Sequence, residues 1–169
     1  MNTAYILTGG NLGDRLANLQ KATHYLGKET GKIVASSSMY ETEAWGNNDQ
    51  PDFYNQVHII NTKLSAEQMM QKILKIEEQM GRVRAGKNAS RIIDIDILFF
   101  NDDVINKRDL IIPHIEISNR RFVLTPLNEL SPELIHPVLN KSINELLSTC
   151  KDTLSVKPLK TILPYQQIL

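Results

Sequence analysis

Two aspartates stand one residue apart inside an otherwise apolar run, R-I-I-D-I-D-I-L-F-F, that extends from Arg91 to Phe100. β-Branched and aromatic residues dominate the run, which predicts a strand. Alternate residues of a strand point to the same face and lie about 6.5–7 Å apart. Asp94 and Asp96 therefore share one face, while the isoleucines around them point the other way, into a core.

The segment directly upstream, R-V-R-A-G-K-N-A-S-R from Arg82 to Arg91, is rich in basic residues. Arginine forks bind phosphate oxygens at two points, and paired carboxylates hold Mg²⁺, which usually shares its ligands with substrate phosphates. The combination indicates phosphoryl-transfer chemistry on a nucleotide. The alternative, a solvated strand face with alternate acidic residues, fits less well because the flanking alternate residues are apolar.

Length and charge limit the other possibilities. A chain of 169 residues suits one domain with a substantial core. Lysine plus arginine and aspartate plus glutamate number 19 each, so the net charge of zero argues against a general nucleic-acid binder. The lone Cys150 excludes an internal disulfide and a cysteine-based zinc site, and it fits a reducing cytosol.

The N-terminal sequence M-N-T-A-Y-I-L-T-G-G lacks the basic region and the apolar length of a signal peptide. No apolar run approaches the length of a transmembrane helix. We therefore expect a soluble, cytoplasmic monomer that acts on small molecules, without nucleic-acid or membrane partners.

Hydrophobic periodicity predicts strands over residues 5–8, 32–42, 53–64 and 92–100, and helices over 16–26, 66–80, 120–130 and 142–149. Ser65 is a candidate N-cap for the second helix, and a loop is predicted to lead to Pro113. The first six elements follow the order strand, helix, strand, strand, helix, strand. This order predicts an α+β ferredoxin-like sandwich, a mainly antiparallel sheet with helices packed on it. We assign residues 1–151 to this domain and 152–169 to a C-terminal tail.

The segment from Thr42 to Asn55 mixes rings with amides. It holds the aromatic residues Trp45, Phe53 and Tyr54 and the amides Asn47, Asn48, Gln50 and Asn55. Such a mixture suits a flat heteroaromatic ligand, which stacks on rings and has polar edge atoms for the amides. A turn-rich surface loop explains the same composition equally well.

Three weaker signals complete the pattern. The G-G-N-L-G-D sequence after the first predicted strand lacks the lysine of a phosphate-binding loop, which favours a plain strand-to-helix turn. His114 and the Arg120–Phe122 segment form a third polar cluster, and Glu77 interrupts an apolar helical stripe. No metal-ligand spacing relates the remaining histidines, His24, His58 and His136.

In this order the motifs resemble those of the 6-hydroxymethyl-7,8-dihydropterin pyrophosphokinases of folate biosynthesis. The matching pieces are G-G-N-L-G-D, Y-E-T-E-A-W-G with D-Q-P-D-F-Y-N, G-R-V-R, R-I-I-D-I-D-I-L, and I-P-H with N-R-R-F-V-L-T-P-L. Each piece alone is weak, but the ordered set is specific. The resemblance implies ATP-dependent transfer of pyrophosphate to the hydroxymethyl group of the pterin, with AMP released.

The resemblance also implies residue roles. Asp94 and Asp96 would hold two Mg²⁺ ions on the ATP phosphates, and Arg82 and Arg91 would contact those phosphates. The nucleotide side would include Glu77, Arg84, His114 and Arg120. On the pterin side, Thr42 and Asn55 would form hydrogen bonds, Phe53 and Phe122 would enclose the ring, and Trp45 would contribute a further aromatic surface.

The chain departs from the family pattern at four positions. Gly10 replaces the usual serine, and Ala44 replaces a common proline. In the segment from Arg82 to Arg91, called the arginine loop here, Asn88 replaces a tryptophan and Ser90 replaces a proline. These changes concern loop closure, and they leave both carboxylates and both principal arginines in place.

Two alternatives remain at this level. A two-metal phosphodiesterase would also use paired aspartates, but it leaves the ring-and-amide segment unexplained. A non-catalytic ferredoxin-like binding module would not require the carboxylate pair, and the aromatic strand pattern of an RNA-binding version is missing from the sequence.

Overall fold

A computed structural model describes residues 1–46 and 49–159. The chain forms, in order, β1 (Asn2–Gly10), α1 (Arg15–Glu29), β2 (Lys32–Ser36), β3 (Tyr40–Thr42), β4 (Phe53–Thr62), α2 (Ala66–Gln79), β5 (Asp94–Phe100), β6 (Ile105–Lys107), β7 (Leu110–Ile112), a short 3-10 helix (Ile117–Asn119), α3 (Arg121–Leu130), α4 (Ile143–Thr149) and β8 (Val156–Pro158).

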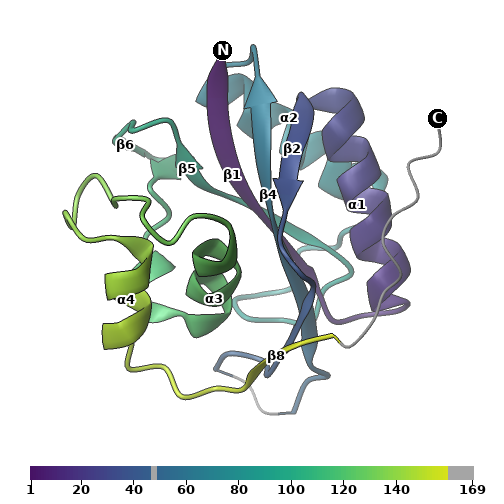
Figure 1. The fold of residues 1–169 in the computed structure, drawn as a ribbon. Coiled ribbons are helices and arrows are strands. Elements are labelled where there is room, and N and C mark those ends of the chain that lie inside the picture. Colours follow the sequence, from purple (N-terminus) through teal and green to yellow (C-terminus); the bar gives the residue numbers. More distant parts are fainter. Residues whose placement is uncertain (47–48, 160–169) are drawn as a thin grey trace.

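Within these residues, six strands build one sheet in the order β5-β1-β4-β3-β8, with β2 paired to β4 beside β3. Each pairing in it is antiparallel. Helices α1 and α2 cover one face of the sheet, and α3 and α4 lie on the other, as Figure 1 shows. The predicted ferredoxin-like α+β sandwich is confirmed.

Local sequence signals explain where the two long helices begin. The Asp14 carboxylate caps α1 by accepting a hydrogen bond from the Ala17 amide at 3.0 Å. Ser65 and Gln68 form a reciprocal capping box at the start of α2, as the predicted Ser65 cap required. The sheet-facing stripes of both helices then enter one core, which includes Leu19, Leu26, Met69, Ile73 and Ile76.

The strand with the two aspartates has the predicted alternation. Ile93, Ile95 and Ile97 are buried in the core under α1 and α2. Asp94 and Asp96 point to the opposite face, where Leu98 belongs to the second core, under α3 and α4. One strand therefore anchors the first core and presents its carboxylates on the other face.

Three details differ from the sequence predictions. The strand predicted over 32–42 is two strands, because residues 37–39 leave the ladder and the Ser37 hydroxyl accepts from the Val57 amide. The predicted loop before Pro113 contains the β6–β7 hairpin, and the C-terminal segment contributes β8 to the edge of β3. These strands have three residues each, too few for a periodic pattern to show.

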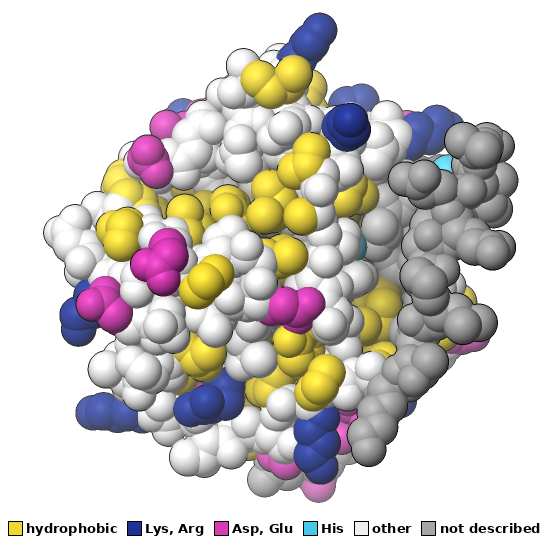
Figure 2. Space-filling view, viewed as in Figure 1, with side chains coloured by type: hydrophobic (Ala, Val, Ile, Leu, Met, Phe, Trp, Pro, Cys, Tyr) yellow, Lys and Arg dark blue, Asp and Glu magenta, His cyan; other side chains and the backbone are white. Residues whose placement is uncertain are grey.

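On the face of the molecule that Figure 2 shows, hydrophobic side chains occur at several places, with acidic and basic side chains between them. Neither sign of charge dominates this face, in keeping with the balanced composition. Across the described residues, every helix is too short or too polar to span a membrane.

Candidate active site

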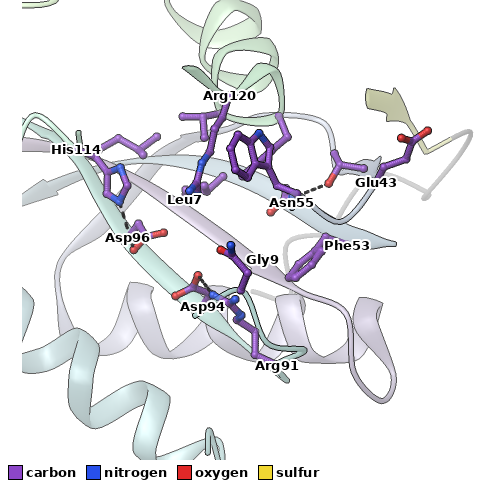
Figure 3. A pocket seen from close by; sticks show the side chains of 16 residues that line it. Leu7, Gly9, Glu43, Phe53, Asn55, Arg91, Asp94, Asp96, His114 and Arg120 are labelled. Atoms are coloured by element: carbon purple, nitrogen blue, oxygen red, sulfur yellow. Dashed lines mark hydrogen bonds and ion pairs between the residues drawn. The ribbon is translucent and has the colours of Figure 1, made fainter. Parts of the chain in front are cut away.

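Two cavities open on the face of the sheet that carries the aspartates. The first lies between the ends of β1, β4 and β5 and the start of α3, and Figure 3 shows its lining. The second is enclosed largely by the loop of residues 82–91. Both are lined by the same six residues where they meet: Asn88, Arg91, Asp94, Asp96, His114 and Arg120.

The sheet register sets the position of the carboxylates. Asp94 lies opposite Gly9 of β1, and Asp96 lies opposite Leu7. Gly9 and Leu7 both line the first cavity, so the two carboxylates stand on its floor. Nε2 of His114, directly beyond the β6–β7 hairpin, lies 4.0 Å from Oδ1 of Asp96.

Two arginines neutralise Asp94. Arg82 donates to its Oδ1 at 2.8 Å, and Arg91 donates to its Oδ2 at 2.9 Å. Both carboxylate oxygens are thus engaged by groups that bind phosphate equally well. An incoming polyphosphate could therefore take over the arginines and release Asp94 for a metal ion.

The buried carboxylate of Glu77 forms an ion pair with Arg82. Its Oε1 accepts from Arg82 at 2.5 Å and from the Ile95 amide at 2.8 Å, and the residue is only 3% exposed. Burial raises the pKa of Glu77, against the opposing effect of the Arg82 charge. Glu77 lines neither of the two cavities, so its predicted contact with adenosine remains a prediction.

The electrostatic environment of Asp96 differs from that of Asp94. Burial of the carboxyl, followed by the charges of Asp94 and Glu77, raises the pKa of Asp96 to about 8. Burial and the neighbouring Arg120 lower the pKa of His114. The charges of Arg82 and Arg120 oppose the rise at Asp96, and a cation in the cleft would add to their effect by favouring the charged carboxylate.

The carboxylate pair fits Mg²⁺ in the mode that nucleotide enzymes use. Among the described residues, no cluster of three or more histidine, cysteine, aspartate or glutamate side chains could hold a metal ion by itself. Mg²⁺ commonly takes one or two carboxylates and completes its shell with water and substrate phosphates. Asp94 and Asp96 fit this shared mode and do not form a closed metal cage.

The other end of the first cavity, called the ring end here, combines aromatic side chains with a buried amide. Asn55 is buried on β4, and its amide donates to the Thr42 hydroxyl of β3 at 2.7 Å. Phe53 of β4 and Phe122 of α3 are also in the lining, together with Trp45. Gly9 leaves room for Asn55, because a Cβ there would lie 2.3 Å from its Oδ1.

Arginine side chains join the ring end to the carboxylate end. The Arg120 guanidinium lies 5.1 Å from the Trp45 ring and 5.8 Å from the Phe122 ring. That of Arg91 lies 5.8 Å from the Phe53 ring. Nε of Arg120 is buried without a hydrogen-bond partner in the described structure, and its nearest carboxylate oxygen, Oε2 of Glu116, lies 3.7 Å away in an ion pair. A ligand anion could supply the missing hydrogen bond.

Asn11 is a buried residue of the site that the motif analysis did not single out. Its Oδ1 accepts from the Arg91 amide at 2.9 Å, and its Nδ2 donates to Oε1 of Gln50 at 3.0 Å. Gln50 in turn donates to the carbonyl of Asn88. Asn11 thus links the glycine turn, the ring-and-amide segment and the arginine loop, and its place directly after Gly9-Gly10 was the available signal.

Apart from Glu77, the residues predicted for the site by number line one or both cavities, with two qualifications. The Arg84 side chain is 69% exposed, and its guanidinium lies 3.6 Å from Glu77. Asn47 and Asn48, two of the amides assigned to ring recognition, lie outside the described residues.

Comparison with known proteins identifies the family. The sequence pattern of 7,8-dihydro-6-hydroxymethylpterin-pyrophosphokinase (HPPK) matches residues 5–132. The chain is 37% identical over its full length to 2-amino-4-hydroxy-6-hydroxymethyldihydropteridine pyrophosphokinase of Aquifex aeolicus, covering 99% of that protein. The chain belongs to the HPPK family.

Other members share the domain in two settings. The Haemophilus influenzae pyrophosphokinase is 35% identical over 93% of this chain and 98% of its own length. Folic acid synthesis protein fol1 of Pneumocystis carinii is 36% identical over 95% of this chain, which spans only 21% of that longer protein. The HPPK domain thus occurs as nearly a whole chain and as part of a larger one.

Solved structures confirm the HPPK fold. The crystal structure of Plasmodium falciparum HPPK-DHPS superimposes with a TM-score of 0.70 and 24% identity, covering 88% of this chain and 43% of that chain.

The glycine that replaces the usual serine of HPPK sequences has a structural reason here. A Cβ on Gly10 would lie 2.3 Å from the carbonyl oxygen of Ile92. The backbone of the arginine loop approaches β1 too closely at this point for any side chain.

Proposed function

We propose that this chain transfers pyrophosphate from ATP to the hydroxymethyl group of 6-hydroxymethyl-7,8-dihydropterin and releases AMP, as a step of folate biosynthesis. The observation that carries the proposal is the pair of cavities that share Asp94 and Asp96. A flat ring in the first cavity and a polyphosphate in the second would meet at the carboxylates. Both the family and the most complete relatives support this assignment.

The carboxylates and arginines divide the work on the phosphates. Asp94 and Asp96 would hold Mg²⁺, with two ions expected, which neutralises phosphate charge and acidifies the attacking hydroxyl when bound. Arg82 and Arg91 would leave Asp94 for the phosphate oxygens. They would then stabilise charge that develops on the transferring group.

The hydroxyl attacks the β-phosphorus in line, and the α-phosphate oxygen leaves with AMP. The protein contributes position and charge and forms no covalent bond. At the ring end, Thr42 and Asn55 are neutral and hydrogen-bonded to each other, and the carboxylate of Glu43, also in the described lining, belongs to a solvent-exposed residue. Mg²⁺ held by Asp94 and Asp96 would lower the pKa of the attacking hydroxyl when bound, so we assign no general base to the protein.

On the pterin side, Phe53 and Phe122 would enclose the ring, and Trp45 would border it. Asn55 and Thr42 would bind its polar edge, for which their mutual hydrogen bond pre-orients them.

The nucleotide side comprises the outer wall of the second cavity. Arg84, His114 and Arg120 line it and would contact ATP. Glu77 would act near the adenosine side, where it holds Arg82. The polar loop between Arg84 and Arg91 would close over the phosphates once both substrates are bound.

Assembly and location complete the proposal. We infer a monomer that works in the cytoplasm on small molecules, without nucleic acid. The zero net charge and the lone Cys150 support this inference. The two-metal phosphodiesterase and the non-catalytic binding module are not favoured, since neither accounts for the match to HPPK.

Isothermal titration with hydroxymethyldihydropterin and a non-hydrolysable ATP analogue, with and without Mg²⁺, tests the proposal. Both ligands should bind to one protein molecule at once, and the ATP analogue should require Mg²⁺. A coupled assay should detect AMP only when pterin is present. Binding of the nucleotide without binding of the pterin would refute the assignment.

A further inference from the structure

Residues 152–159, the described part of the C-terminal segment, connect two walls of the first cavity, which is called the ring cavity below. Residues Val156–Pro158 of β8 pair with Tyr40–Thr42 of β3. Beside this ladder, the Glu43 amide donates to the Ser155 carbonyl at 3.3 Å, and the Leu159 amide donates to the Met39 carbonyl at 2.9 Å. The segment therefore holds the strand that carries Thr42 and leads into Glu43, both in the cavity lining.

The same segment caps α3 through Asp152. Arg120 occupies the N-cap position of α3 and makes no capping hydrogen bond with its own side chain. Instead, Oδ2 of Asp152 accepts from the Arg121 amide at 2.9 Å. The other oxygen, Oδ1, accepts from the Leu154 amide at 2.9 Å and fixes the turn toward β8.

The Arg121 side chain in turn binds the backbone of Asp152. Its Nε donates to the carbonyl of Asp152 at 2.9 Å, so backbone and side chain of each residue hold the other. A carboxylate at this position also interacts favourably with the positive end of the α3 dipole.

The residues that flank Arg121 are the ones that face the ligand. Arg120 and Phe122 both line the ring cavity, and α3 carries them on its first turn. The far end of α3 is held separately, by Glu129, which accepts from the Tyr40 hydroxyl at 2.5 Å and from the Ser38 amide at 2.8 Å. Asp152 is thus the tie at the end of α3 nearest the cavity.

We propose that Asp152 is a positioning residue for the pterin: it fixes the first turn of α3, and thereby Phe122, at the separation from the β3–β4 wall that a flat ring requires. This inference rests on the proposed function. Stacking energy falls steeply when a ring loses close contact with its neighbour. The opposite wall, with Phe53 and Asn55, belongs to the central strand β4 and does not depend on this tie.

Two variants of Asp152 and one matched control test the inference in the full chain. Asp152→Ala removes both acceptors, and Asp152→Asn keeps the shape and one acceptor. Glu145→Ala is the control, because Glu145 also caps a helix: its Oε2 accepts from the Ser142 amide at 2.7 Å at the start of α4. Glu145 is absent from the lining of both cavities.

Pterin affinity is measured by fluorescence titration, ATP-analogue affinity by calorimetry, and stability by thermal unfolding. Asp152→Ala should weaken pterin binding about tenfold and Asp152→Asn about threefold, the range expected from the loss of a helix cap. The steady-state KM for pterin should rise more than kcat falls, and ATP-analogue affinity should change by a smaller factor. Glu145→Ala should lower the unfolding temperature and leave pterin affinity unchanged.

The outcomes separate the two claims. Failure of the wild-type protein to bind pterin would refute the proposed function. If the wild type binds and folded Asp152→Ala binds equally well, Asp152 has no positioning role. Should Asp152→Ala not fold, wild-type affinity in Asp152→Asn would overturn the inference, as would an equal loss in Glu145→Ala.

Discussion

Two polar clusters lie on opposite faces of the same sheet. Neighbouring residues of β1 lie beside them: Leu7 and Gly9 at the first cluster, and Thr8 at the second. Asp94, Asp96, Arg82 and Arg91 form the cleft cluster, opposite Leu7 and Gly9. The intervening residue, Thr8, turns to the other face, where its hydroxyl lies 3.4 Å from Nε2 of His58.

This second, hydroxyl cluster consists of His58 with Thr8, Thr23 of α1 and Ser36 of β2. The Thr23 hydroxyl lies 3.3 Å from Nε2 of His58, and that of Ser36 lies 2.7 Å from Nδ1. His58 is 0% exposed, whereas the Asp96 side chain remains 35% exposed to the cleft.

Both clusters shift a pKa, mainly through burial. The pKa of Asp96 rises to about 8 and that of His58 falls to about 4, each toward the neutral form. What distinguishes them is access and charge. The cleft cluster is open and holds opposite charges that a ligand can re-pair, while His58 is sealed among neutral hydroxyls. A shifted pKa marks a functional site only when such a cleft accompanies it.

If the cleft cluster is the reactive one, removing a carboxylate should have the largest effect on turnover. Asp96→Ala and Asp94→Ala should each lower kcat by at least about 1,000-fold, because metal-mediated charge stabilisation is worth several kcal/mol. Asp96→Ala should leave stability unchanged or higher at pH 9, since it removes a carboxylate whose charged form is disfavoured in the folded chain. The rate of AMP formation measures the effect on turnover, and thermal unfolding measures the effect on stability. Near-normal AMP formation would mean that the cleft cluster is not the reactive one.

The arginines of the cleft cluster should act when charge develops on the transferring group. Arg91→Ala and Arg82→Ala should lower kcat by about 100-fold and raise the KM for ATP by a smaller factor. Arg108→Ala, an equal charge change at an exposed position outside both cavities, is the control. A change confined to the KM for ATP would make the arginines ground-state anchors.

The ring end of the cleft should respond through affinity. Phe122→Ala should weaken pterin binding by about ten- to a hundredfold, as base–aromatic stacking is worth roughly 1–3 kcal/mol. Asn55→Ala should cost about 1–3 kcal/mol by leaving a polar edge of the ring unpaired. Separate fluorescence titrations with pterin and an ATP analogue should show the loss for pterin alone. Unchanged pterin affinity in both variants would place the ring elsewhere.

The alternation of the Asp94 strand was predictable from sequence, because residues two apart on a strand share a face whatever the tertiary structure. Helix α2 was predictable from the helical period of its apolar residues and from the Ser65 cap. Local rules therefore recover both the carboxylate pair and most of the sheet.

Contacts between distant segments were not predictable. The link from Asn11 to Arg91 joins residues 80 positions apart, and Asp152 reaches Arg121 across 31 positions. Hydrophobic periodicity does not indicate which distant residue a polar side chain such as Asn11 or Asp152 will bind. His58 illustrates the converse: the sequence prediction assigned it no role because no ligand spacing relates it to other residues, and its burial depends on how α1 and β2 pack around β4.

The smallest effect on activity should come from the hydroxyl cluster, and it should appear in stability. His58 binds its proton at about pH 4 in the folded chain and near 6.5 when unfolded. Between these values the unfolded state holds more protons, so the free energy of unfolding falls as the pH is lowered from 7 toward 4. A difference of this size removes about 2 kcal/mol between pH 7 and pH 5.

His58→Gln cannot titrate, so its loss of stability between pH 7 and pH 5 should be about 2 kcal/mol smaller than that of the wild type, whatever its stability at pH 7. Subtracting the two profiles cancels the contributions of His114 and His136, whose lowered pKa values act in the same direction. Urea unfolding at each pH gives the free energies, with His24→Gln on the exposed side of α1 as the control. At pH 7 the kcat of folded His58→Gln should stay within about twofold of the wild type, because the variant leaves the cleft lining intact. Parallel profiles for His58→Gln and wild type would mean that His58 does not have the lowered pKa. A large loss of kcat would mean that His58 is linked to the cleft and that the two clusters act as one.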